Sequence, residues 1–332
     1  MDIRNTSEIK KAALRRLRDA DQAKRVAAIY AALTLGVSVL VMIANLVLNL
    51  MIEQAAGLGG MSRRTVLISL QTILPVISVP ITLCLELGYQ AAMLRVARGQ
   101  YVSPQSLRLG FDRFWVLLRC VALECLMLLA VCMGSIYLGC LIFMLSPFSQ
   151  QAVALMQPMM ENATLLNPQA AMDSGLYDQI LGAMLPAFGI CILLATVLGA
   201  IVLFRYRLAH FVIIDKPGIP AMAALRESRK MLKGNCGKLL RLDVSLWWYY
   251  AAGLLASLLC YADMLLPMLG VSLPWSDTVS YYLFFALYLA AQFGVYYFLR
   301  NRAETAYAIA YDSLRPKQNQ SQGAVLGSIF RQ

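Results

Sequence analysis

The sequence has little of what most active sites are built from. Its 332 residues include one histidine, His210, so any site that needs two imidazoles is excluded. It contains no G-x-S-x-G or H-E-x-x-H motif, and the stretch 234–238 is too short for a phosphate-binding P-loop. Its eight cysteines form no C-x-x-C pair and lie almost wholly in apolar runs, which favours small apolar side chains over metal ligands. We therefore expect no catalytic residues, no metal and no cofactor.

Charge is also scarce, and where it occurs it is mostly positive. Charged residues make up 14% of the chain and hydrophobic residues 60%, whereas soluble domains carry about 25% charged residues. This composition is typical of a protein in a lipid bilayer. The net charge of +11 is compatible in principle with nucleic-acid binding. However, the cations are confined to the joints between long apolar runs, a distribution that membrane topology explains and a nucleic-acid surface does not.

Six long apolar runs organise the sequence. Each exceeds the roughly 20 helical residues that cross the hydrocarbon layer, so the pattern predicts an all-α membrane protein with six transmembrane helices. The predicted spans are 26–52, 66–94, 114–145, 180–214, 239–266 and 279–299. Residues 26–314 are expected to form one transmembrane domain.

The positive charges predict how these spans are oriented. Of the 29 lysines and arginines, all but Arg63 and Arg64 lie before the first span, after an even-numbered span or beside one of these joints. Cytoplasmic joints of membrane proteins carry an excess of lysine and arginine. Both termini are therefore expected in the cytoplasm, in a multi-pass protein of the cell membrane.

Three segments outside the spans have their own patterns. Residues 1–25 are expected to hold a basic amphipathic helix, because Ile9, Ala13 and Leu17 recur at four-residue spacing among cations. The joint 146–178 contains prolines and only acidic charge, and it is expected outside the cytoplasm in irregular or partly helical form. Residues 315–332 are rich in Gln, Ser and Gly, which predicts a disordered cytoplasmic tail.

Small residues recur at four-residue spacing in the first and last spans. The first span has Ala28, Ala32 and Gly36, and the last has Ala286, Ala290 and Gly294. Such stripes let helix backbones approach closely in lipid. They favour packing within one bundle, with association between copies as the alternative.

The joint between the fourth and fifth spans is the longest basic segment between two apolar runs. A helix that begins at Pro220 places one apolar arc opposite four cations, and Gly234-Asn235 suits its C-terminal cap. We expect this helix in the headgroup region, with its apolar side inward and its cations toward lipid phosphate or a partner protein. The four cations are Arg226, Arg229, Lys230 and Lys233.

Glu86 and Glu124 are the carboxylates well inside the apolar runs. They lie roughly 12 and 15 Å from the cytoplasmic ends of their spans, so they could share a depth. Two hypotheses remain open. As a pair they could carry a proton or bind a cation in a transporter or channel; alternatively, each is neutralised in a structural polar cluster. The cations considered for such a cluster are Arg119, Arg205 and Arg207.

Several motifs resemble a known family. They are Asp215-x-Pro217, the run Ser228-x-x-x-Leu232-Lys233-Gly234-Asn235, and the run Leu242-Asp243-Val244-Ser245-Leu246. Together with the segments 9–17 and 306–314, they are similar to an uncharacterised bacterial integral membrane family, domain of unknown function nine hundred and seventy-five. The resemblance covers residues 7–314 and departs from the family in the long joint 146–178 and at Leu232, where methionine is usual. It implies a multi-pass membrane protein, with a looser similarity to the membrane domain of some glycerophosphodiester phosphodiesterases. It implies no established activity, so it assigns no catalytic residue.

Overall fold

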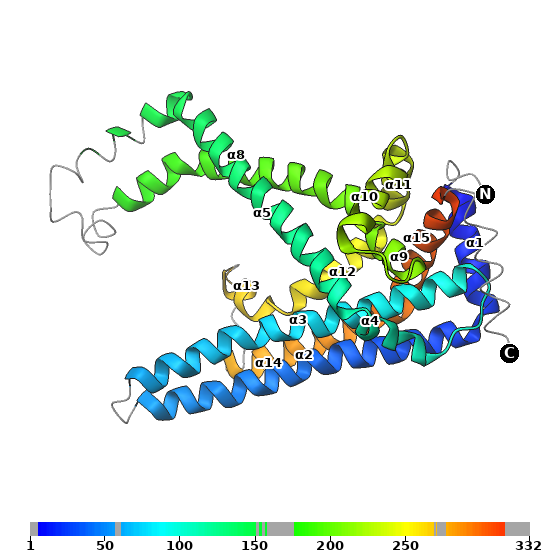
Figure 1. Ribbon diagram of the computed structural model, residues 1–332. Helices are drawn as coiled ribbons and strands as arrows, with labels where there is room; N and C mark the ends of the chain where they lie inside the picture. The colour runs from blue at the N-terminus through cyan, green and yellow to red at the C-terminus, as the bar shows by residue number, and fades with distance from the viewer. Residues whose placement is uncertain are drawn as a thin grey trace. The chain divides into compact units, whose positions relative to one another are not determined.

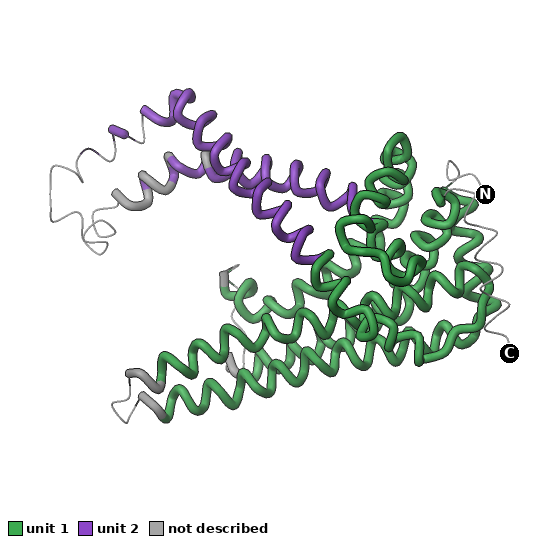
Figure 2. Tube along the Cα trace, in the orientation of Figure 1, with its two compact units in different colours: residues 1–120, 208–332 green, residues 121–207 purple. Residues whose placement is uncertain are grey.

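In the computed structural model, the described part of the chain is helical (Figure 1). The structure describes residues 6–56, 61–150, 153–154, 157, 176–268, 270 and 277–315. Most of the joint 146–178 and the tail from residue 316 onward lie outside these residues, so the expectations for them stay predictions. The chain divides into two compact units, residues 1–120 with 208–332 as unit 1 and residues 121–207 as unit 2 (Figure 2).

Five helices are long and apolar enough to cross a membrane, and a bent helix pair brings the number to six. The first three predicted spans correspond to α2 (Asp21–Ala56), α3 (Met61–Ala97) and α5 (Phe114–Met144). The basic helix predicted in residues 1–25 is α1 (Thr6–Asp19), which buries Ile9 and Ala13. The long apolar helices of the prediction are therefore confirmed.

The last three predicted spans are not simple helices. The fourth is α8 (Leu176–Tyr206), followed after a turn by the short helix α9 (Ala209–Asp215). The fifth, predicted as one helix over 239–266, is wrong in its continuity. It consists of α11 (Cys236–Ser245), α12 (Trp247–Leu259) and α13 (Ala262–Met268), with a bend of 56° between α11 and α12. The sixth continues from α14 (Asp277–Gly294) through a π-helical turn, η3 (Val295–Arg300), into α15 (Asn301–Leu314).

Unit 1 buries one end of its long helices and exposes the rest. The helix α3 buries most of residues 84–96 and exposes apolar side chains over most of 64–83, and α2 changes in the same way near Leu35. The buried part, which we call the packed end, comprises residues 9–35, 84–117, 208–246 and 295–311. Apolar side chains exposed over whole helical turns are typical of contact with lipid.

The helix α15 lies at the centre of the packed end. Nine of its 14 residues are buried, and it contacts α1, α2 and α3 (Figure 1). The helix α1 also contacts α11, where the Lys10 ammonium donates a hydrogen bond to the Ser245 carbonyl at 3.2 Å. The N-terminal helix, the fourth joint and the C-terminal helix thus belong to one packed body.

Two glycines allow the second joint to fold back along α3. The 3₁₀ turn η1 (Pro104–Arg108) and the short helix α4 (Leu109–Asp112) both contact α3. A Cβ atom at Gly88 would lie 2.3 Å from the Leu107 carbonyl oxygen, and one at Gly110 would lie 1.8 Å from the Cys84 carbonyl oxygen. Any larger side chain at either position would therefore push this joint away from α3.

The stripes of small residues are only partly covered in unit 1. Ala32, Ala286 and Ala290 are exposed there, whereas Ala28, Gly36 and Gly294 are half-buried. A Cβ atom at Gly36 or Gly294 would meet no atom within 4 Å. The preferred interpretation, close packing within one bundle, therefore has no support from this unit, and association between copies stays untested.

Candidate functional site

The basic helix of the fourth joint forms as the sequence predicts. It is α10 (Ala221–Leu232), with Pro220 as its N-cap, and Gly234 beyond its end has the left-handed φ of 82°. The predicted apolar arc is buried and consists of Ala221, Ala224, Leu225, Ser228, Met231 and Leu232. All four predicted cations are exposed on the other side: Arg226, Arg229, Lys230 and Lys233.

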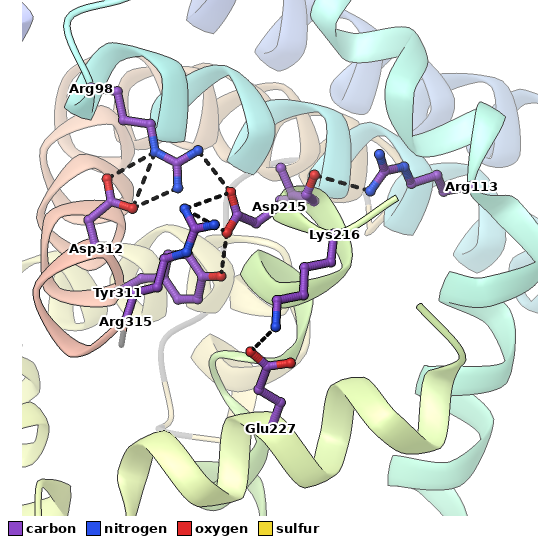
Figure 3. Close-up of polar contacts among 9 residues, drawn as sticks. Arg98, Arg113, Asp215, Lys216, Glu227, Tyr311, Asp312 and Arg315 are labelled. Atoms are coloured by element: carbon purple, nitrogen blue, oxygen red, sulfur yellow. Dashed lines mark hydrogen bonds and ion pairs between the residues drawn. The ribbon is translucent and has the colours of Figure 1, made fainter. Parts of the chain in front are cut away.

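The buried arc of α10 packs against protein. The helix α9 is among its contacts. Glu227 fixes the helix further, because its carboxylate lies 2.5 Å from the Lys216 ammonium (Figure 3). The cations of α10 are thus held on a rigid support, and they are the part of the helix that can meet a ligand.

A partly buried ion-pair cluster ties three segments of unit 1 together. Asp215, at the end of α9, is 5% exposed and lies 2.9 Å from Arg98 and 3.0 Å from Arg315 (Figure 3). Tyr311 of α15 donates a hydrogen bond to the same carboxylate at 3.1 Å. Arg98, just after α3, also donates to both carboxylate oxygens of Asp312, at 2.7 and 3.0 Å. We call these five residues the Asp215 clasp.

The electrostatics of the clasp favour fully charged partners. Burial by itself lowers the pKa of Arg98, but its hydrogen bonds and charge interactions with Asp312 and Asp215 outweigh this effect and raise the pKa above the usual arginine value. Nearby, Arg113 donates hydrogen bonds to the carbonyls of Ile213 and Ile214. Its pKa is lowered by burial, against the smaller opposing effects of Asp112 and Asp215. The bidentate pair between Arg98 and Asp312 fixes the geometry of the two side chains as well as compensating their charges.

A second aspartate, Asp243, is hydrogen-bonded to α15 one turn away from Tyr311. Tyr307 donates a hydrogen bond to Asp243, and Tyr250 donates to the same carboxylate oxygen at 3.1 Å. The hydroxyls of Tyr250 and Tyr307 lie 2.7 Å apart. Tyr307 and Tyr311 are one helical turn apart, so a single face of α15 holds both aspartates that flank α10. These two carboxylates hold the segments on either side of α10 against α15.

Arg300 forms a third buried site, which the sequence did not indicate. Its guanidinium lies 2.6 Å from Glu86 of α3 and 3.7 Å from Glu304. It also stacks over the rings of Tyr30, Tyr89 and Tyr296, at 5.1, 5.8 and 5.3 Å from their centroids. Arg300 ends the π-helical turn, a rare conformation that is frequent at functional positions.

The residues of the predicted intramembrane site are not brought together within one unit. Glu86 and Arg119 belong to unit 1, whereas Glu124, Arg205 and Arg207 belong to unit 2. Glu86 is neutralised by a cation, as the structural hypothesis expected, but that cation is Arg300. Arg300 was missed because it stands at the end of the last apolar run, 214 residues from Glu86, where spacing gives no signal.

The described residues offer little for metal or redox chemistry. In the ranges that the structure covers, no three His, Cys, Asp or Glu side chains gather as a metal site. The eight cysteines are free thiols, and His210 is half-buried near the start of α9. What this arrangement can do chemically is to present exposed cations on a packed support.

One comparison with known proteins identifies a family for this chain. Residues 1–318 match a family described as "Protein of unknown function (DUF975)". No curated protein and no solved structure matches the chain. The match covers almost the whole sequence, including α10 and both aspartates that flank it, so the chain belongs to the DUF975 family.

Proposed function

We propose that the chain is a multi-pass membrane protein, without catalysis of its own, that binds anionic lipid headgroups on the cytoplasmic side. The binding residues are Arg226, Arg229, Lys230 and Lys233. The observation that carries the proposal is that Arg226, Arg229 and Lys230 on α10 and Lys233 directly after it are exposed, while the opposite face of α10 is buried in protein. A cation near an anionic membrane surface contributes about 1 kcal/mol of attraction, so four at one helix act together.

The proposed orientation has support from the contacts of the packed end. The helix α1 touches both α15 and α11, so the two ends of the described chain and the fourth joint lie together. These segments carry most of the cations, which membrane proteins keep on the cytoplasmic side. A membrane crossed an even number of times, with both termini inside, accommodates this arrangement.

The alternative of a small-solute or ion transporter rests on Glu86 and Glu124. The Glu86 carboxylate is bonded to Arg300, and this guanidinium is buried against three tyrosine rings. A carboxylate held in this way is neutralised by a fixed cation, which counts against its use in carrying ions. We therefore favour the lipid-binding proposal.

The test is lipid retention by the purified full-length protein. The variant replaces the four α10 cations with glutamine: Arg226→Gln, Arg229→Gln, Lys230→Gln and Lys233→Gln. Native mass spectrometry would count phosphatidylglycerol and phosphatidylcholine molecules that stay bound at low and high salt. We expect the variant to lose phosphatidylglycerol affinity by about tenfold or more at low salt, with phosphatidylcholine unchanged.

A charge-matched control separates a site from net charge. It removes four exposed cations from α1 and the start of α2: Lys11→Gln, Arg15→Gln, Arg18→Gln and Lys24→Gln. We expect this control to retain most of its phosphatidylglycerol affinity. Equal losses in the two variants, or no loss in the α10 variant, would contradict the proposal.

A further inference from the structure

The helix α11 leaves an apolar ridge uncovered. Leu240 is 54% exposed and Val244 is 65% exposed. Their spacing of four residues places them on one side of the helix. Trp247, the first residue of α12 beyond the bend, is 67% exposed. The other side carries Leu239, Leu242 and Leu246, which are buried in protein. One apolar side of α11 is thus used by the packed end, and the other faces outward.

The helix α11 differs in charge from the helix that follows it. All 13 residues of α12 are uncharged, whereas the 10 residues of α11 include Lys238, Arg241 and Asp243. The bend of 56° turns α11 away from the direction of α12. A charged helix that leaves a span at such an angle fits the boundary between lipid and water.

From this geometry we infer that α11 lies in the plane of the membrane interface and inserts its ridge of Leu240 and Val244 among the lipid acyl chains, next to Trp247 at the start of α12. Exposed Arg241 beside the ridge would then meet lipid phosphate. The inference rests on the proposed function for the kind of lipid and deepens it. The apolar anchor of the fourth joint is α11, while α10 supplies the cations.

Continuity with the span identifies the occupant as lipid. Beyond the bend, exposed apolar side chains continue along α12, among them Trp247, Leu254 and Leu255. Tryptophan is enriched where spans meet the headgroup layer, and Trp247 stands at that position in α12. A protein partner on α11 would have to displace lipid from a surface that is continuous with the membrane-facing side of α12.

The test is site-specific photo-crosslinking in native membranes with the full-length chain. The photoreactive amino acid benzoylphenylalanine replaces Leu240 or Val244 in turn, both of which are exposed and tolerate a large side chain. Leu254, 63% exposed on α12, is the positive control, and Arg229 on α10 is the aqueous control. Mass spectrometry of the irradiated protein would identify lipid adducts and protein adducts.

We expect lipid adducts at Leu240 and Val244 within about threefold of the yield at Leu254, and about tenfold above Arg229. Protein adducts at the two ridge positions, or adduct yields as low as at Arg229 while Leu254 reacts, would overturn the inference. The lipid-binding proposal fails in a different experiment, the one in which the α10 glutamine variant is tested for phosphatidylglycerol affinity. We expect that variant to leave the crosslinking at Leu240 and Val244 unchanged, so the two failures can be told apart.

Discussion

The Asp215 side chain is almost fully buried, forms two ion pairs and accepts a hydrogen bond. Removing its charge should therefore destabilise the folded protein. We predict that Asp215→Asn lowers the free energy of unfolding by about 3 kcal/mol, because Arg98 and Arg315 would be left without a full counter-charge. Thermal unfolding of the purified protein in a mild detergent would measure the loss.

Asp112 provides the matched control for this prediction. Its side chain is 60% exposed, and its pair with Arg108 spans 3.7 Å on the surface of a short helix. Asp112→Asn should cost no more than about 0.5 kcal/mol, the usual value for an exposed pair. If the two variants unfold at the same temperature, the Asp215 clasp does not stabilise the packed end.

We predict that the contribution of Arg300 to the free energy of unfolding depends on the shape of its side chain as well as on its charge. Arg300→Lys keeps the charge but loses the planar guanidinium that meets Glu86 and the three tyrosine rings. We expect a loss of about 2 kcal/mol in the free energy of unfolding, from weaker cation–π and ion-pair contacts. The neighbouring exposed Arg302 is the control, since Arg302→Lys should leave the unfolding temperature unchanged. Equal effects at both positions would contradict this account.

The burial or exposure of a single residue could be predicted from the sequence where helical periodicity alone determines it. The buried arc of α10 and its exposed cations follow from spacing within 12 residues, and the structure has them as expected. The partners of Glu86 and Asp215 were not predictable, because Arg300 and Arg315 reach them from distant parts of the chain. Such contacts depend on tertiary packing, which leaves no periodic signal.

At the scale of elements, α15 organises the packed end. Its side chains bind Asp215 and Asp243 through Tyr311 and Tyr307, and Tyr89 of α3 donates a hydrogen bond to Asn301 at 2.6 Å. The sequence singled out the fourth joint instead, because its charge pattern is conspicuous. Burial of α15 could not be inferred, since alternating small and aromatic residues also suit a helix that merely continues a span.

The contact between α4 and α3 gives a prediction at this scale. Gly110→Ala places a methyl group against the Cys84 carbonyl, so α4 must move away from α3. We expect a loss of about 2 kcal/mol in the free energy of unfolding, a typical cost of overpacking. Gly237→Ala is the matched control, because a Cβ atom there meets no atom within 4 Å. Alanine is also the better helix former, so this variant should be neutral or slightly stabilising. The prediction fails if Gly110→Ala is as stable as Gly237→Ala.

The boundaries between α11, α12 and α13 could not be predicted from the pattern of apolar residues. The span predicted over 239–266 merged three helices, because a run of apolar residues does not reveal a bend within it. Charge was the available signal, since Lys238, Arg241 and Asp243 are all confined to α11. Weighting these charges more heavily would have placed the start of the span near Trp247.

At the scale of the whole molecule, composition was the most reliable guide. Low charge and long apolar runs predicted a helical membrane protein, and the structure has five or six helices that could span a bilayer. The packed end was not anticipated. Its buried turns mix apolar residues with polar ones, among them Gln90, Asn301 and Glu304, and no local pattern shows that tertiary packing covers them.

The central claim is that the basic packed end faces the cytoplasm, and the side of the membrane on which α10 lies tests it most directly. Cells would produce the full-length chain carrying Lys233→Cys, or Arg64→Cys at the opposite joint. Right-side-out membrane vesicles would then be treated with a membrane-impermeant maleimide, and labelling would be read at each position by peptide mass spectrometry. We predict that position 64 reacts in sealed vesicles and position 233 reacts only after permeabilisation. Labelling of position 233 in sealed vesicles, with position 64 protected, would contradict the account.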